Sequence, residues 1–270
     1  MRRALPGIVA GLAAGALLAA AWRLYDGRLR ERRPSAEGLD DPEVARAFGR
    51  IARLPQMRLL RWFAARRALS MVRQGAALDL GCGPGDLVFL LARRAPDLHV
   101  TGVDLSDEML AQAGAAARGQ GLGERVSFRS GDATHIPFPG GSLDLVVSTM
   151  SLHHWSDPVP ALDEIARVLR PGGAFLVFDL RRDLAAPAWL LLWFATHVVV
   201  PRALRRVNEP MGSRDAAYTP QEAAQLAGQS RLAGWRVTQG SLWLTLEGVT
   251  PGGPALTPGT ASGTAGSAPA

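Results

Sequence analysis

A glycine-rich stretch directly after an apolar segment constrains the fold more than any other feature of the sequence. Residues 77–86 read Ala-Leu-Asp-Leu-Gly-Cys-Gly-Pro-Gly-Asp, and an amphipathic helical pattern follows. Glycines there allow a tight turn and let backbone amides approach a ligand without side-chain obstruction. Dinucleotide-binding proteins place a G-x-G-x-x-G turn between strand and helix. Here the third glycine, Gly85, comes one residue early and Asp86 takes its place, so the spacing argues against NAD.

Short apolar segments alternate with amphipathic stretches along the chain after Ala76, which predicts a parallel sheet covered on both faces. The predicted strands are Ala76–Leu80, Val100–Asp104, Val126–Ser130, Leu143–Ser148 and Ala174–Asp179. The predicted helices are Asp86–Arg94, Ser106–Arg118 and Ala161–Leu169. A further helix opens with a capping box, formed by Thr219 and Glu222. Two final strands are predicted as a hairpin, Trp235–Gln239 and Leu242–Glu247.

Two carboxylates close predicted strands. Asp104 ends the second strand, where a carboxylate can accept both ribose hydroxyls of an adenosine. A helix cap is its alternative role, although Ser106 and Asp107 already serve that helix. Asp132 closes the third strand, where it can accept from an adenine amine or simply complete a Gly-Asp turn.

Six sequence segments occur in an order and spacing that chance does not explain. They are 78–85, Val103-Asp104-Leu105-Ser106 with Met109-Leu110, Gly131-Asp132-Ala133 with Ile136-Pro137-Phe138, 142–146, Leu152-His153-His154-Trp155, and Leu169-Arg170-Pro171-Gly172-Gly173. Together they resemble the class I S-adenosylmethionine-dependent methyltransferases, in the small-molecule and lipid branch that includes the ubiquinone and menaquinone methyltransferases. The resemblance implies a Rossmann-like, doubly wound α/β sheet of seven strands, with one antiparallel strand in the terminal hairpin.

The resemblance also implies where S-adenosylmethionine, the cofactor of this family, binds. The methionine end is assigned to Asp79 and the loop residues Gly81, Cys82, Gly83 and Gly85. Asp104 and Leu105 are assigned to the ribose, and Asp132 and Ala133 to the adenine. Ser148 is expected to approach the sulfonium, and residues 169–173 to form a structural turn. We expect the Cys82 side chain to serve packing.

Three side chains are candidates for a general base, in the order His154, His153 and Tyr218. A base is needed only if the acceptor is protonated and weakly acidic. A structural role for the two histidines is the alternative. We predict no metal site, because the chain has one cysteine and adjacent histidines rarely chelate one ion together.

The N-terminal residues have the length and composition of a membrane segment. Residues 4–22 carry no charge and are about as long as a helix that crosses the hydrocarbon core. A cleaved signal peptide and a buried soluble helix are alternatives. We favour an uncleaved single-pass anchor, residues 1–33 with its basic flank, because the arginines that follow it place the main domain in the cytoplasm.

The rest of the chain divides into three parts. Residues 34–74 are predicted to be helical and basic, and either lie on anionic headgroups or cap the domain as an ordinary helix pair. Residues 75–250 form the methyltransferase domain, with a lid-like insertion at 183–218. The apolar run 189–194 of that insertion either covers an apolar substrate or packs on the sheet. Residues 251–270 are predicted to be disordered.

These features predict methyl transfer from S-adenosylmethionine to a small, apolar or membrane-associated acceptor such as a lipid or a quinone precursor. A non-catalytic, membrane-tethered protein that senses the cofactor is the alternative. All 30 basic residues are arginines, and the net charge of +6 would suit nucleic acid. Nucleic-acid methyltransferases, however, carry a motif such as Asn-Pro-Pro-Tyr where this chain reads Ser148-Thr149-Met150-Ser151.

Overall fold

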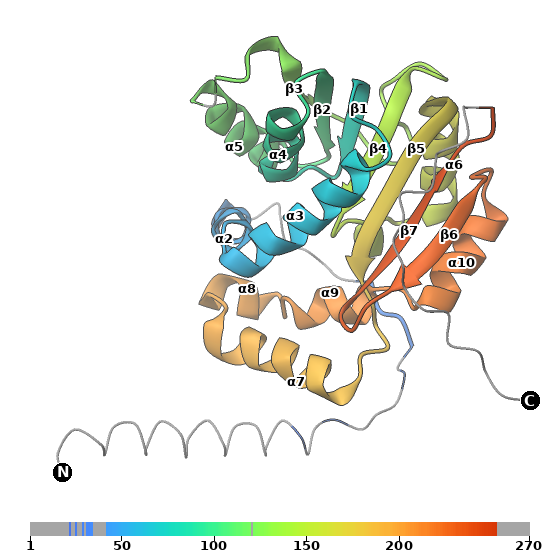
Figure 1. Cartoon of the computed structure of the whole chain (residues 1–270). Coiled ribbons are helices and arrows are strands. Elements are labelled where there is room, and N and C mark those ends of the chain that lie inside the picture. Colours follow the sequence, from blue (N-terminus) through green and yellow to red (C-terminus); the bar gives the residue numbers. More distant parts are fainter. Residues whose placement is uncertain are drawn as a thin grey trace, which may run out of the picture.

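A seven-stranded sheet forms the centre of the molecule (Figure 1). The computed structural model describes residues 42–119 and 121–252, together with Trp22, Tyr25, Leu29 and residues 31–34. The strand order is β3-β2-β1-β4-β5-β7-β6. The strands are β1 (Gly75–Leu80), β2 (Leu98–Asp104), β3 (Val126–Ser130), β4 (Leu143–Thr149), β5 (Leu169–Leu180), β6 (Trp235–Gln239) and β7 (Trp243–Val249).

Strand direction places the functional loops at one edge of the sheet. Strands β1 to β5 are mutually parallel, and β7 runs antiparallel to both β5 and β6. The order reverses between β1 and β4, and ligands of open α/β sheets bind in the crevice outside the carboxyl ends of the strands at such a point. The predicted Rossmann-like sheet with its antiparallel terminal strand is confirmed.

Helices cover both faces of the sheet, because alternate residues of each strand point to opposite sides. Leu78 belongs to the core under α6 and α10, and its neighbour Ala77 to the core under α3 and α4. The helices of these layers are α3 (Pro55–Leu69), α4 (Asp86–Arg94), α5 (Asp107–Arg118), α6 (Pro158–Val168) and α10 (Pro220–Gln229). The capping box of α10 is present, with Thr219 accepting from the Glu222 amide at 3.1 Å and donating its own amide to Glu222 at 2.8 Å.

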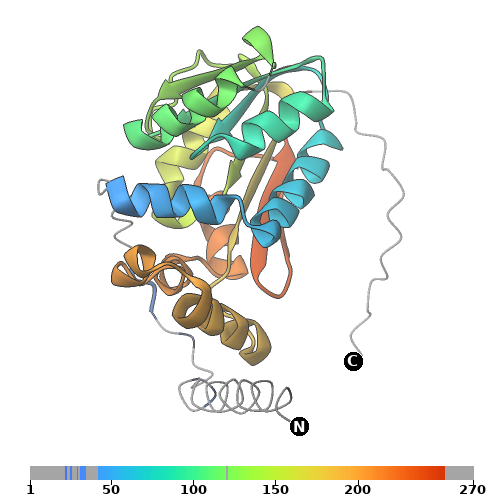
Figure 2. The same cartoon turned by 90° about the vertical axis from the view of Figure 1, so that its left-hand side faces the viewer.

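Residues 183–218 follow β5 and so lie beyond the carboxyl edge of the sheet. They contain α7 (Ala186–Phe194), a π-helical turn η3 (Ala195–Val199), α8 (Arg202–Arg206) and α9 (Met211–Ala216). Both views show these helices grouped at one end of the molecule (Figure 1 and Figure 2). The first described helix, α2 (Pro42–Ala52), packs on α8 through the cluster of Val44, Ala47, Val200, Ala203 and Leu204.

Strand β5 begins earlier than predicted. Residues 169–173 were expected to form a turn, but Leu169 already pairs with Leu143, and the register then shifts before Ala174 pairs with Leu145. The left-handed conformation of Gly172, with φ of 78°, accommodates this irregularity. The predicted turn is therefore an irregular start of the strand.

The predicted membrane anchor falls largely on residues whose structure is not described. Of residues 4–22, only Trp22 lies among the described residues, and the predicted tail after Gly252 also lies outside them. Within the described part of the chain, no helix combines the length and the apolar character needed to cross a bilayer.

Candidate functional site

The glycine loop between β1 and α4 has the backbone shape that its sequence predicts. Gly81, Gly83 and Gly85 all have positive φ, at 75°, 52° and 82°. The amides of Gly81 and Cys82 donate to the Val103 carbonyl, at 2.8 and 3.0 Å, which ties the loop to the end of β2. A Cβ on Gly81 would lie 2.2 Å from the Ser151 Oγ. The loop therefore touches the segment after β4 directly.

Asp79, at the end of β1, is a buried carboxylate without a hydrogen bond. It is 1% exposed, and neither carboxylate oxygen has a partner. Burial, reinforced by the nearby charge of Asp104 and opposed by Arg61, raises the pKa of Asp79 to about 8. A buried acceptor of this kind is costly unless a donor or a cation meets it. A positively charged ligand group beside the loop would therefore stabilise the Asp79 carboxylate.

Asp104 fixes the glycine loop and still has acceptor capacity. Its Oδ2 accepts from the Gly83 amide at 2.7 Å, and its Oδ1 accepts from the Ser106 amide at 2.9 Å. An ionised carboxylate has about four acceptor positions, more than these two backbone bonds use. The next residue, Leu105, is 73% exposed and offers an apolar surface at the same place. Ser106 caps α5 by accepting from the Met109 amide, as predicted.

Asp132 and Ala133 lie in the loop after β3, beside Asp104. The Gly131 amide donates to the Asp104 carbonyl at 3.1 Å, which joins the two loops. Asp132 is exposed, and its Oδ1 accepts from the amide and hydroxyl of Thr134 at 2.8 and 3.0 Å. The carboxylate thus organises its own turn at the rim of the candidate site.

Ser148 and Cys82 are buried in the scaffold of this site. Ser148 is fully buried, and its hydroxyl donates to the Leu80 carbonyl at 2.7 Å. It therefore joins the ends of β4 and β1, while the residues behind it, from Thr149, approach the loop. Burial raises the pKa of the Cys82 thiol above its ordinary range, which leaves it inert as a nucleophile.

A histidine–carboxylate pair occupies the ends of β4 and β5. His153 follows β4 in a short 3₁₀ helix, η2 (Leu152–His154), and Asp179 lies near the end of β5. The Nδ1 of His153 is 2.6 Å from the Asp179 Oδ1, and the His153 amide donates to the Oδ2 at 2.8 Å. Both side chains are almost completely buried. The His154 ring lies against the His153 ring, with centroids 3.8 Å apart, and is half-buried.

Tyr218 and Arg32 complete this second group. Burial, more than any neighbouring charge, raises the pKa of Tyr218, so the phenol stays protonated and is a poor base. Arg32 stacks over the Tyr218 ring at 4.2 Å. Its Nη2 donates to the His153 carbonyl at 3.1 Å and its Nε to the Ala216 carbonyl at 2.7 Å. Asp179 and Arg32 were not predicted; the carboxylate at the end of the fifth predicted strand was the available signal for Asp179.

No metal-binding cluster exists in the described part of the chain. Nowhere there do three or more histidine, cysteine or acidic side chains gather as ligands.

Comparisons with known proteins decide the family. Residues 78–177 match the model of a methyltransferase domain. The demethylmenaquinone methyltransferase of Porphyromonas gingivalis is 31% identical over 175 residues, which cover 62% of this chain and 69% of that protein. The chain belongs to the class I S-adenosylmethionine-dependent methyltransferases. The cofactor of this methyltransferase is S-adenosylmethionine.

Other similarities are narrower. The demethylmenaquinone methyltransferase of Thermus thermophilus is 40% identical over 123 residues, covering 44% of this chain and 54% of that protein. A crystal structure of an S-adenosylmethionine-dependent methyltransferase from Methanococcus maripaludis shares the fold, with a TM-score of 0.60 at 19% identity over 80% of this chain and 96% of that one. The methyltransferase spans about half the length, or less, of several curated relatives that it matches.

The residues of the methyltransferase fit its cofactor. The partnerless carboxylate of Asp79 suits the ammonium of the methionine end. A Cβ on Gly83 would meet no protein atom within 4 Å, so the middle of the loop faces open space. Asp104 lies at the carboxyl end of β2, beside the exposed Leu105, where a carboxylate can accept from ribose hydroxyls. The assignment of the β1 and β2 ends to the cofactor remains a prediction, which these features favour.

Proposed function

We propose that the chain transfers a methyl group from S-adenosylmethionine to a small apolar acceptor whose proton passes to His153. One observation carries this proposal: a carboxylate-held imidazole lies at the same sheet edge as the glycine loop. Ser151, which is two residues before His153, is in contact range of Gly81. The cofactor loop and the proposed base are therefore neighbours.

Asp179 determines which ring nitrogen of His153 carries the proton. With Asp179 as an acceptor-only carboxylate, the proton between the two groups sits on the His153 Nδ1. The Nε2 of His153 is then the unprotonated ring nitrogen, and in this proposal it takes the proton of the acceptor. The carboxylate also stabilises the imidazolium that forms. Among the three candidate bases, this geometry favours His153 over His154, and the raised pKa of Tyr218 disfavours the phenol.

The remaining catalytic work is alignment and exclusion of water. S-adenosylmethionine supplies a methyl group that is already activated by its sulfonium. The residues of the chain hold the two reactants in register, which converts a bimolecular step into an effectively intramolecular one. The burial of His153 and Asp179 keeps bulk water away from the base.

An apolar acceptor is supported by the segment after β5 and by the relatives. Helix α7 has the sequence Ala-Pro-Ala-Trp-Leu-Leu-Leu-Trp-Phe, with no charged residue. Trp189 is packed in a small core with Leu184, Ala188 and Tyr25, whereas Leu191 is 60% exposed. Five relatives, including those of Thermus thermophilus and Porphyromonas gingivalis, are named demethylmenaquinone methyltransferases.

We also propose that residues 1–33 form a single-pass anchor with the domain in the cytoplasm. Arg32 touches the acceptor side of the site, and ten residues separate it from Trp22, the end of the predicted span. Even fully extended, ten residues span only about 35 Å. An anchor at that position would hold the acceptor side near the bilayer, where apolar substrates partition.

A methyl-transfer assay with the full chain tests the proposed function. Methyl-labelled cofactor is supplied with demethylated quinols and, separately, with water-soluble phenols. We expect transfer to the apolar set, and Leu191→Ser should lower kcat/KM for that set several-fold while turnover of soluble acceptors is the internal control. Cofactor binding without transfer to any acceptor would contradict the enzyme and support the alternative of a cofactor sensor.

A further inference from the structure

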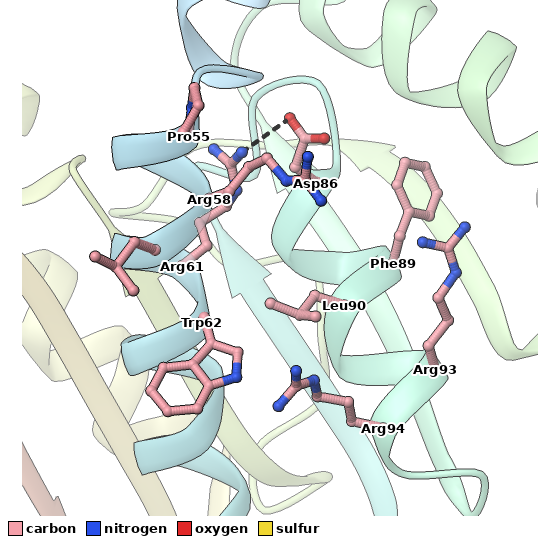
Figure 3. Close-up of a pocket in the computed structure, with 10 residues that line it drawn as sticks. Pro55, Arg58, Arg61, Trp62, Asp86, Phe89, Leu90, Arg93 and Arg94 are labelled. Carbon is pink, nitrogen blue, oxygen red and sulfur yellow. Dashed lines mark ion pairs between the residues drawn. The ribbon is translucent and has the colours of Figure 1, made fainter.

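A groove between α3 and α4 lies beside the glycine loop, since Asp86, which lines the groove, directly follows Gly85. Its volume is about 490 Å³. Figure 3 shows arginines from both helices around it, with Trp62 on one wall. Its lining contains one acidic residue, Asp86, which faces the Arg61 guanidinium at 3.8 Å. The other charged lining residues are Arg58, Arg93 and Arg94.

The positive charge of this face is compensated only in part: Arg61 lies 3.8 Å from Asp86, and Arg67 lies 2.6 Å from Glu247. Between Val44 and Leu78 the sequence has eight arginines and no acidic residue. Helix α3 alone carries four of them. Arg58, Arg66, Arg93 and Arg94 are exposed. A cluster of one sign on adjacent helices creates a local field that attracts polyanions or anionic surfaces.

Apolar side chains protrude from the same face. Leu59 and Phe63 lie one turn apart on α3 and are 56% and 52% exposed. The opposite stripe of α3, which includes Ala64, Ala65, Ala68 and Leu69, is buried against the sheet. Arg66 and Arg94 lie over the Trp62 ring, at 5.5 and 5.9 Å from its centroid. Cations around protruding apolar side chains are the pattern of a helix that rests at a membrane interface.

We propose that the outer face of α3 and α4 docks on an anionic phospholipid surface. The guanidinium groups suit bidentate contact with phosphate oxygens. Leu59 and Phe63 enter the headgroup boundary, which removes them from water. Leu59 favours lipid over nucleic acid, since a leucine offers no ring on which a base can stack, whereas the rings of Phe63 and Trp62 would suit either partner. The surface acts independently of the proposed acceptor chemistry and of the N-terminal anchor.

A dye attached to α3 measures the contact of this face with a lipid vesicle locally. The readout is valid whether or not another segment of the chain binds the same vesicle. Gln56 is exposed and lies seven residues before Phe63, on the same stripe of α3. A Gln56→Cys chain carries an environment-sensitive dye there, since the native thiol of Cys82 is buried. The full chain is incorporated into vesicles of neutral phosphatidylcholine or of phosphatidylcholine with 30% phosphatidylglycerol, a proportion of about one anionic lipid in three. Protection of the dye from an aqueous quencher is the readout.

We expect protection at least threefold greater on the anionic vesicles, and its loss at high salt. Arg58→Gln/Arg93→Gln/Arg94→Gln in the labelled chain should abolish the difference. The matched control, Arg118→Gln/Arg206→Gln/Arg231→Gln, removes the same charge from other exposed positions and should retain it. Circular dichroism and cofactor binding establish that both triple variants are folded.

Three results would overturn the proposal. Equal protection on neutral and anionic vesicles would exclude recognition of headgroup charge. Equal losses in the two triple variants would show that net charge, rather than this face, drives binding. Protection by duplex DNA, with the same arginine dependence and none on vesicles, would assign the face to a different polyanion.

Discussion

The candidate site lies along one edge of the sheet, and its two halves are built in different ways. The cofactor half, at the ends of β1, β2 and β3, consists of short loops whose residues lie close together within each loop. Its central bonds join loop backbone to Asp104. The acceptor half, at the ends of β4 and β5, joins Arg32, His153, Asp179 and Tyr218, which are far apart in the sequence. The proposed cofactor half is therefore built from short loops that each carry a local sequence motif, while the proposed acceptor half is built from single residues that only tertiary structure brings together.

The largest effect is expected in the acceptor half. Replacing His153 or Asp179 by Asn removes the proposed base or the carboxylate that orients it. We expect turnover to fall by about 10² to 10⁴, the range typical of a lost general base. His154→Asn is the matched change and should cost less than about tenfold. The measurement is single-turnover methyl transfer.

The affinity for S-adenosylmethionine should remain within a few-fold of the wild type in these variants. If the Asp179→Asn chain turned over normally, or if it lost cofactor binding as well, the two halves would not be separate in function.

In the cofactor half, the glycines allow a comparison between two neighbouring positions. Gly81→Ala combines a positive φ with a Cβ that would lie 2.2 Å from Ser151 Oγ and 2.8 Å from its Cβ. We expect it to lower the free energy of unfolding by about 2–4 kcal/mol. Gly83→Ala has the positive φ without the contact, so it should cost only about 1 kcal/mol. Urea denaturation measures both, and equal losses would contradict the described contact.

The smallest expected effect is the change in stability and cofactor binding that follows the protonation of Asp79. Its pKa in the folded chain, about 8, lies above the ordinary value of 3.8. The unfolded chain therefore loses this proton at lower pH, and the free energy of unfolding of the ligand-free protein should fall as pH rises from 3.8 towards 8. An ammonium beside Asp79 favours the carboxylate, so cofactor binding at neutral pH should release close to one proton. Calorimetry in buffers of different ionisation enthalpy measures this release, and Asp79→Asn should abolish it.

The sequence predicted the cofactor half better than the acceptor half, for a physical reason. Strand ends, glycine spacing and the Ser106 cap are local properties of the chain, and the structure has them where they were expected. Ser148 was correctly placed at the end of β4, yet its hydroxyl bonds to Leu80, which only sheet pairing reveals. The choice between His153 and His154 depends on Asp179, 26 residues away. No hydrophobic periodicity predicts such a partner, and no sequence motif around Arg32 predicted its place in the site.

Calorimetric titration of S-adenosylmethionine into the full chain tests the central claim most directly. The wild type should bind the cofactor and its demethylated product but not NADH. Asp104→Ala removes the acceptor that holds the Gly83 amide and faces the ribose position, so affinity should fall by about a hundredfold or more. A folded wild type that binds neither ligand, or an Asp104→Ala chain that binds as tightly as the wild type, would contradict the account.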